Sequence, residues 1–146
     1  MTGRPHDHAG MEVLGHAECL RLLWSHAIGR IGFVDQGDPQ ILPVQYRLHD
    51  NRIVFQSAVG AKLDAAIFRT PVVFEIDGSD ETKASGWSVV VHGTARQVEG
   101  EDELAALETL GMQPWVQGSQ PMHWIEIVPN EITGRRIPGS TTSDPS

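Results

Sequence analysis

The sequence predicts a mainly β domain, a small six-stranded Greek-key barrel flanked by three helices. Several short segments carry β-branched and aromatic residues near period two, as half-buried strands do. Three other segments repeat apolar residues at spacings of three and four, as helices that cover a core do. Strands and helices do not alternate regularly along the chain. A small antiparallel barrel is therefore favoured over a doubly wound parallel sheet.

The first helix is expected at residues 12–27. Its core-facing residues, at spacings of three and four, are Ala17, Leu20, Leu23, Trp24 and Ala27. On this pattern Trp24 belongs to the core, and Gly29 is the left-handed residue that ends the helix. Cys19, the one cysteine of the chain, excludes an internal disulfide and is expected to be a small buried residue.

Residues 30–62 predict three strands in a meander, then a glycine loop and the start of a helix at residues 62–68. The strand residues near period two are Ile31, Phe33, Ile41, Val44, Tyr46, Ile53 and Phe55. Residues 36–39 and 49–51 make the two reversals, because both are rich in turn-forming residues.

The next strand is expected at residues 72–76, where a near-continuous apolar run predicts cover on both faces. Residues 77–81 are an acidic turn. The longest strand is expected at residues 86–98, with Gly93 at a bulge or bend. Its two faces carry Trp87, Val89 and Val91 on one side and Ser88, Val90 and His92 on the other.

An amphipathic helix is expected at residues 101–110, with acidic residues in its first turn. Trp115 follows in a polar loop, where it is a candidate for a dimer contact or a lid over a ligand. The last strand segments are residues 122–128 and 131–137, on either side of Pro129–Asn130.

The chain divides into a flexible arm at 1–10, one domain at 11–138 and a disordered tail at 139–146, which suits a length of 146 residues. The formal net charge of −8, without a Lys/Arg block, disfavours nucleic acid and anionic membranes as partners. No run of eighteen apolar residues and no signal peptide is evident, so we expect a cytoplasmic protein. No metal site is expected, because the acidic turn lacks calcium-loop spacing.

The junction between the third strand and the second helix has the residue types of a phosphate site. Lys62 falls in the first helical turn, where the dipole disfavours a cation by about 0.3–1 kcal/mol. An anion bound there, held by free N–H groups, the Ser57 hydroxyl and Lys62, would make the position favourable for the Lys62 cation. The alternative is that the Asp64 carboxylate alone compensates the charge of Lys62, and that Ser57 is an ordinary loop hydroxyl.

Six segments in this order resemble the pyridoxamine 5′-phosphate oxidase-like flavoproteins. They are GRIGFVD, PQILPVQY, NRIVFQS, GAK, GWSVVVHGTARQV and WIEIVPNEITGRRI, and the resemblance covers residues 9–138. It implies a split β-barrel fold that binds FMN. The superfamily is matched more closely than the oxidase itself, which has a C-terminal substrate-binding segment and more Arg at its phosphate site.

The resemblance further implies a homodimer with two FMN molecules between the subunits and a small-molecule substrate. The residues matched to the isoalloxazine ring are Pro43, Val44, Gln45 and Tyr46. Those matched to the ribityl chain and phosphate are Gln56, Ser57 and Lys62. Trp87 and Ser88 match a strand that approaches the cofactor, often from the second subunit. Arg135 and Arg136 match a GRR-like ending of the family.

The function expected from this resemblance is an FMN-dependent oxidoreductase that uses a reduced nicotinamide and a small organic acceptor or dioxygen. The candidate proton donors are Tyr46, His92 and His123, and no catalytic residue is assigned. One alternative is a deazaflavin cofactor in the same groove, which is disfavoured because only eleven Lys and Arg are available for its acidic tail. Another is a non-enzymatic carrier or sensor of flavin or another planar ligand such as haem.

Overall fold

The computed structural model describes residue 6 and residues 10–59, 62–68, 70–112 and 121–139, the side chain of Lys62 excepted. The strands in this part of the chain are β1 (Glu12–Val13), β2 (Ile28–Asp35), β3 (Asp38–Gln45), β4 (Arg47–His49), β5 (Arg52–Ala58), β6 (Val72–Asp80), β7 (Ser85–Gln97) and β8 (Met122–Ile137). The helices are α1 (His16–Ser25), α2 (Lys62–Ile67) and α3 (Glu101–Glu108). The expected arm and tail, and Trp115, lie almost wholly outside the described residues.

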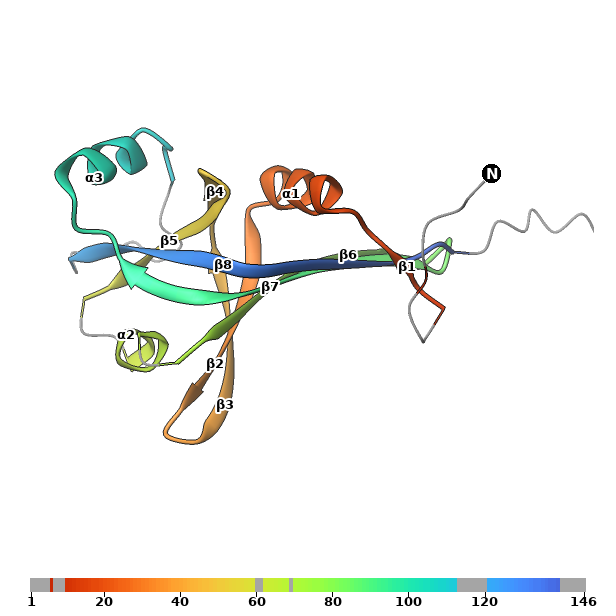
Figure 1. The fold of residues 1–146 in the computed structure, drawn as a ribbon, viewed down its shortest axis with the longest axis horizontal. Helices are drawn as coiled ribbons and strands as arrows, with labels where there is room; N and C mark the ends of the chain where they lie inside the picture. Colours follow the sequence, from red (N-terminus) through yellow and green to blue (C-terminus); the bar gives the residue numbers. More distant parts are fainter. Residues whose placement is uncertain (1–5, 7–9, 60–61, 69, 113–120, 140–146) are drawn as a thin grey trace, which may run out of the picture.

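All strands join one antiparallel sheet in the order β3-β2-β6-β7-β8-β5-β4, with β1 on β8. Strands β3 and β4 are separated by Tyr46 alone, yet they lie at opposite ends of this order. The sheet must therefore curl until its ends approach each other at Tyr46 (Figure 1). The split-barrel class is confirmed, with eight strands in the described residues rather than six.

Two tight hairpins set the register on either side of Tyr46. Gln36 and Gly37 connect β2 to β3, and Asp50 and Asn51 connect β4 to β5, all four with positive φ between 51° and 82°. Two-residue loops of this kind match the twist of the flanking strands. Both reversals lie where the sequence predicted them, each within a slightly shorter span.

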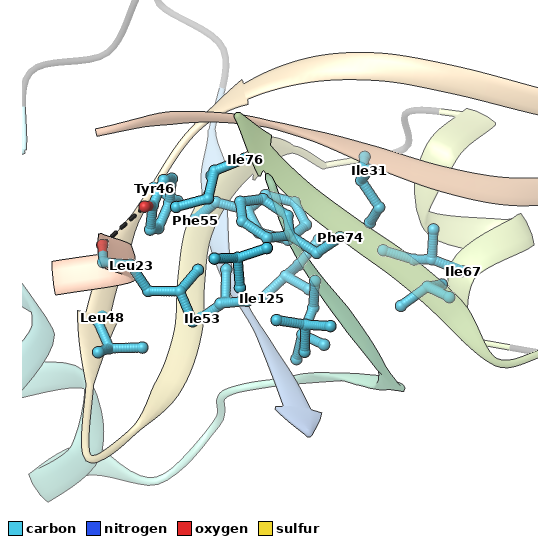
Figure 2. Close-up of a cluster of buried hydrophobic side chains, with 14 of the residues drawn as sticks. Leu23, Ile31, Tyr46, Leu48, Ile53, Phe55, Ile67, Phe74, Ile76 and Ile125 are labelled. Carbon is cyan, nitrogen blue, oxygen red and sulfur yellow. Dashed lines mark hydrogen bonds between the residues drawn. The ribbon is translucent and has the colours of Figure 1, made fainter. Parts of the chain in front are cut away.

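The barrel interior is apolar and is closed at two ends by helices. Leu23 of α1 and Ile67 of α2 lie at opposite ends of the buried cluster, with Phe55 and Phe74 between them (Figure 2). On the other side of the sheet, α3 covers a second cluster made of Val54, Val98, Leu107 and Trp124.

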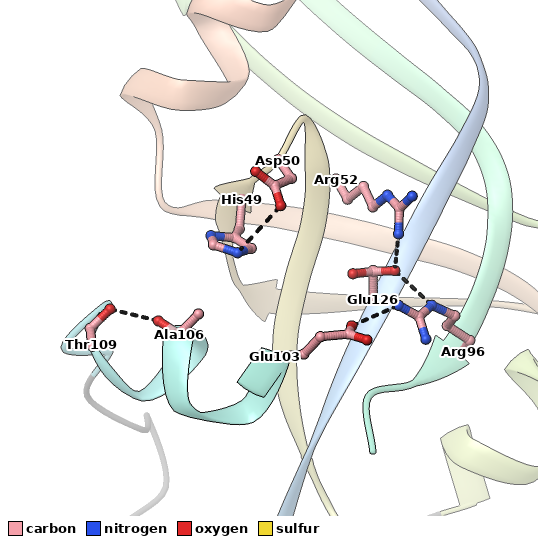
Figure 3. A network of polar contacts seen from close by, with 8 residues as sticks. All are labelled: His49, Asp50, Arg52, Arg96, Glu103, Ala106, Thr109 and Glu126. Carbon is pink, nitrogen blue, oxygen red and sulfur yellow. Dashed lines mark hydrogen bonds and ion pairs between the residues drawn. The ribbon is translucent and has the colours of Figure 1, made fainter. Parts of the chain in front are cut away.

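A chain of ion pairs fixes α3 to the sheet. The Glu126 carboxylate, in a residue only 5% exposed, accepts from Arg52 at 2.8 Å and from Arg96 at 2.7 Å. Arg96 also donates to Glu103 of α3 at 2.9 Å (Figure 3). Two guanidinium groups compensate the buried carboxylate, which would otherwise be costly to bury.

The first helix is shorter than predicted, and its buried face is rotated. It begins at His16, and its fully buried residues are Cys19 and Leu23. Trp24 is 73% exposed, so its assignment to the core was wrong. Gly29 does not end the helix but lies inside β2, where a Cβ would clash with the ring of Phe74. The burial predicted for Cys19 is confirmed.

The two last strand segments form one strand, β8. The bulge expected near Gly93 is confirmed, because the β7–β8 register shifts between His92 and Gly93. Asn130 is the extra residue on β8, since Gly93 pairs with Pro129 and His92 with Glu131. The bulge absorbs the Pro129–Asn130 dipeptide without ending the strand. Residues 77–80, predicted as part of an acidic turn, instead extend β6.

None of the helices in the described residues is both long enough and apolar enough to cross a membrane.

Candidate functional site

Pro43, Gln45 and Ser88 share one face of the sheet. Pro43 pairs with Arg30, Arg30 with Glu75, and Glu75 with Val90. Side chains of directly paired residues point to the same side, and so do residues two apart on one strand. Gln45 and Ser88 are each two residues from members of this row. We call this side the outer face, and its members include Ile28, Arg30, Val34, Ile41, Pro43, Gln45, Glu75, Asp77, Ser88, Val90 and His92.

The outer face exposes apolar side chains around a small ionic cluster. Ile28, Val34 and Ile41 are 57%, 44% and 68% exposed. Arg30 donates to Asp77 at 2.8 Å and to Glu75 at 3.2 Å. Burial, together with the hydrogen bond and charge of Asp77, raises the pKa of Glu75, and Arg30 opposes this rise.

Val44, Tyr46 and Trp87 belong to the interior. Val44 and Trp87 pack against the main core. Tyr46 is fully buried, donates its hydroxyl to the Leu23 carbonyl at 2.7 Å and meets Phe74 edge-to-face. Burial raises the pKa of Tyr46 well above its usual value. In this structure the Tyr46 hydroxyl is therefore part of the scaffold, and it would have to leave the Leu23 carbonyl to act as a proton donor.

Trp87 has a neighbour that the sequence did not reveal. The ring of His26 approaches the indole edge-on, with centroids 4.9 Å apart, and His26 Nδ1 lies 2.8 Å from the Leu22 carbonyl. Because a carbonyl only accepts, Nδ1 carries a proton in this contact. His26 follows α1 and Trp87 lies on β7, so only the tertiary fold brings the two rings together.

Ser57 and His123 lie on either side of Asp64 where β5 ends and α2 begins. The Ser57 hydroxyl donates to Asp64 Oδ1 at 2.9 Å, and His123 Nε2 lies 2.5 Å from Asp64 Oδ2. The second contact has ion-pair distance but lacks hydrogen-bond alignment, so Oδ2 and Nε2 are buried without an aligned partner among the described residues. The contact is an ion pair when the imidazole is protonated.

This arrangement bears on the predicted phosphate ligands. A serine hydroxyl has one proton, and that of Ser57 is used on Asp64, so Ser57 cannot donate to a phosphate at the same time. Its role as a phosphate ligand requires the hydroxyl to leave Asp64. Lys62 begins α2, and its side chain lies outside the described residues. Gln56 is half-buried and lies directly opposite Trp124 in the β5–β8 pair.

Within one chain, the residues matched to the ribityl chain and phosphate lie far from Trp87 and Ser88. Ser57 pairs with His123 near the start of β8, whereas Ser88 pairs with Arg135 near its end. These partners are twelve positions apart on one strand, which corresponds to about 40 Å of strand length. Arg136 pairs with Trp87 and lies at the same far end.

The chain matches known proteins over most of its length. Residues 15–136 match the family model described as pyridoxamine 5′-phosphate oxidase. An uncharacterised protein of Mycobacterium tuberculosis is 33% identical over 129 residues, which are 85% of this chain and 84% of that protein.

Two solved structures are also similar. An FAD binding protein from Mycobacterium smegmatis is 36% identical with a TM-score of 0.77, over 86% of this chain and 97% of that chain. A candidate pyridoxamine 5′-phosphate oxidase from Corynebacterium glutamicum is 31% identical with a TM-score of 0.75, over 89% and 95% of the two chains. By family model, sequence identity and fold together, the chain belongs to the pyridoxamine 5′-phosphate oxidase-like split β-barrel family.

Proposed function

We propose that the protein is a homodimeric flavin-dependent oxidoreductase that binds the FMN moiety of its cofactor between the outer faces of two subunits. The observation that carries the proposal is the separation of Gln56–Ser57 from Trp87–Ser88 along β8. If both groups contact one cofactor, they must come from different chains. A relative at 36% identity is an FAD binding protein, which supports a flavin here as well.

The outer face suits a flat ring with apolar surfaces. Pro43 is exposed and has no backbone N–H, so it offers a wall without a competing donor. Ile28 and Ile41 extend that apolar surface, and Gln45 supplies an amide for the polar edge of the ring. The exposed apolar residues also suit burial against a second copy of the chain.

A bound flavin would supply the redox chemistry, which is hydride transfer from a reduced nicotinamide and electron transfer to a small organic acceptor or dioxygen. The chain would hold and orient this cofactor, and we assign Lys62 to its phosphate. Among the candidate proton donors, His92 is exposed on the outer face, whereas Tyr46 is buried and His123 is tied to Asp64. Of the three candidates, we therefore propose His92 as the proton donor near the ring.

A deazaflavin with an acidic tail is the less favoured cofactor. Arg30 of the outer face is already paired with Glu75 and Asp77, so it has little charge to offer that tail. Equilibrium dialysis against FMN and a deazaflavin separates the two, and tighter deazaflavin binding would contradict the flavin assignment. If the protein binds flavin but NADH and NADPH do not reduce that flavin in the absence of oxygen, measured as loss of its visible absorbance, the protein would be a carrier or sensor.

The dimer seam is tested with two variants of similar exposure. Ile41→Asp places a charge on the outer face, and Trp24→Asp places one on α1, where Trp24 is 73% exposed against 68% for Ile41. We expect light scattering and flavin titration to show a flavin-binding dimer for the wild type and Trp24→Asp. Ile41→Asp should be monomeric and should lose flavin. A monomeric Ile41→Asp that still binds flavin would rule out a shared site.

A further inference from the structure

Asp64 carries a buried carboxylate at the end of the barrel that α2 closes. The residue is only 8% exposed, and its two oxygens meet Ser57 and His123. Ser57 and His123 are directly paired on β5 and β8. They lie on the core side of the sheet, because Phe55 and Ile125, two residues along each strand, are fully buried. The carboxylate is therefore enclosed between the sheet and its own helix.

The net charge of this group depends on the imidazole. The Ser57 hydroxyl is neutral, so among the described partners of Asp64 only His123 can supply a compensating positive charge. His123 Nε2 and Asp64 Oδ2 lie 2.5 Å apart without hydrogen-bond alignment. A protonated imidazole attracts the carboxylate at this distance whatever the direction of its N–H. A neutral imidazole leaves one net negative charge in a place where water screens it poorly.

The proposed flavin phosphate would lie beside this charge. Asp64 is in the first turn of α2, and Lys62, which we assign to the phosphate, is the first residue of the same turn. A phosphate monoester carries about 1.5 to 2 negative charges at neutral pH. An uncompensated Asp64 carboxylate would therefore repel the phosphate and compete with it for the Lys62 cation.

Four other ionisable side chains belong to the elements around His123. Lys62 and Asp64 are those of α2. Glu99 and Glu108 line the open pocket between α3 and the ends of β5, β7 and β8, which His123 also lines. The adjoining end of β5 has no ionisable side chain. Among these residue types only imidazole ordinarily changes its charge between about pH 5 and pH 8, so a pH dependence in that range points to His123.

We propose that His123, acting through Asp64, is the positioning residue that sets the affinity for the flavin phosphate, so that binding of a phosphorylated flavin takes up a proton. With His123 protonated, Asp64 is compensated and Lys62 is available to the phosphate. With His123 neutral, Asp64 repels the phosphate. The protonated protein therefore binds the phosphate more tightly, and this gain is lost as pH rises and His123 is deprotonated. The proposal rests on the proposed function, because it takes the flavin phosphate to lie beside Lys62.

The test titrates flavin-free protein with FMN over a series from about pH 6 to pH 9. The wild type is compared with His123→Gln, which keeps a neutral hydrogen-bond donor near Asp64. The FMN phosphate itself ionises near about pH 6, but this affects both proteins alike, so the ratio of their dissociation constants at each pH isolates His123. We expect His123→Gln to bind FMN about fivefold or more weakly than wild type at the lowest pH, and equally well at the highest.

Two controls separate this effect from others. His49→Gln is the matched variant, because His49 Nε2 also lies next to a carboxylate, at 3.8 Å from Asp50 Oδ2, but beside the start of β5 rather than its end. It should bind FMN as the wild type does at every pH. Riboflavin, which lacks the phosphate, should show no pH-dependent difference between wild type and His123→Gln.

Each other outcome has a definite meaning. An FMN ratio that does not change with pH would overturn the proton linkage and leave the flavin proposal standing, whereas a wild type that binds no FMN at any pH would overturn both. The same pH-dependent ratio for riboflavin would show that His123 does not act on the phosphate, and the proposal would be wrong.

A second variant keeps the test decisive if His123→Gln does not fold. Asp64→Asn removes the negative charge and retains the side-chain oxygen that accepts from Ser57. It should bind FMN about fivefold or more tightly than the wild type at the highest pH, where His123 no longer compensates Asp64. Equal affinity of this variant and the wild type at that pH would overturn the proposal.

Discussion

The Ser57 hydroxyl donates a hydrogen bond of 2.9 Å to Asp64 Oδ1 across the junction between β5 and α2. Both residues are more than nine-tenths buried, at 7% and 8% exposure. The contact joins the end of a barrel strand to the helix that closes one end of the barrel, so it serves the fold at the position where the sequence suggests a ligand.

Ser57→Ala separates these two roles. If the hydroxyl serves the fold, its removal leaves Asp64 under-satisfied and should lower the free energy of unfolding by about 1–3 kcal/mol. Flavin affinity of the folded variant should be unchanged. Denaturant unfolding and flavin titration measure the two quantities. Loss of affinity with unchanged stability would show instead that the hydroxyl contacts the phosphate.

Lys62→Ala should weaken flavin binding with little loss of stability. Removing a charge-assisted contact to a phosphate costs about 1.5–3 kcal/mol, and the position begins a short surface helix. Lys83→Ala, in the turn between β6 and β7, removes the same charge elsewhere and is the control. If both variants bind flavin as the wild type does, Lys62 does not hold the phosphate.

Leu23→Ala should destabilise the fold by about 2–5 kcal/mol through a cavity between α1 and the barrel. Leu23 is fully buried, whereas Leu20 is only half-buried, so Leu20→Ala should cost less. Trp24→Ala, one position away on the exposed face, should change the unfolding free energy by no more than about 0.5 kcal/mol. The same loss at Trp24 as at Leu23 would contradict the observed orientation of α1.

Asp77→Asn should change how stability depends on pH. The pKa of Glu75 is raised in the folded state, first by burial and then by Asp77. The folded protein therefore holds that proton more tightly than the unfolded chain, and this contribution to stability is lost as pH rises from the unfolded pKa of Glu75 through its folded pKa. Removing the Asp77 charge should lower the folded pKa and flatten this loss. Unfolding measured over a pH series gives both slopes, and equal slopes would show that Asp77 does not act on Glu75.

Most of the strands and turns were predictable, because they depend on local signals. Period-two patterns mark β2, β5 and β7, and turn-forming residues mark both tight hairpins. The two faces of β7 also follow from this period, since Val89 and Val91 are buried whereas His92 is exposed. The family could be recognised for the same reason, from segments of sequence in a fixed order.

The errors arose where a residue's environment depends on distant parts of the chain. The apolar spacing in α1 is compatible with two different buried faces of the helix. Contact with β8 and β4 selected the face that buries Leu23 and exposes Trp24. The sequence also could not show that the curl of the sheet places the ring of Tyr46 in the core. Pro129 predicts an interruption between two strands, yet a bulge opposite Gly93 accommodates it within β8.

The sequence by itself determined the strand periodicity, the turns, the family and the residue types available for a phosphorylated ring. Only the tertiary structure decided which side chains face outward and that Ser57 donates to Asp64. It also decided that Ser57 and Ser88 pair with positions far apart on β8. The physical reason is that periodicity fixes the relative directions of neighbouring side chains. Which of those directions is buried depends on the strand or helix that packs there, and that partner comes from elsewhere in the chain.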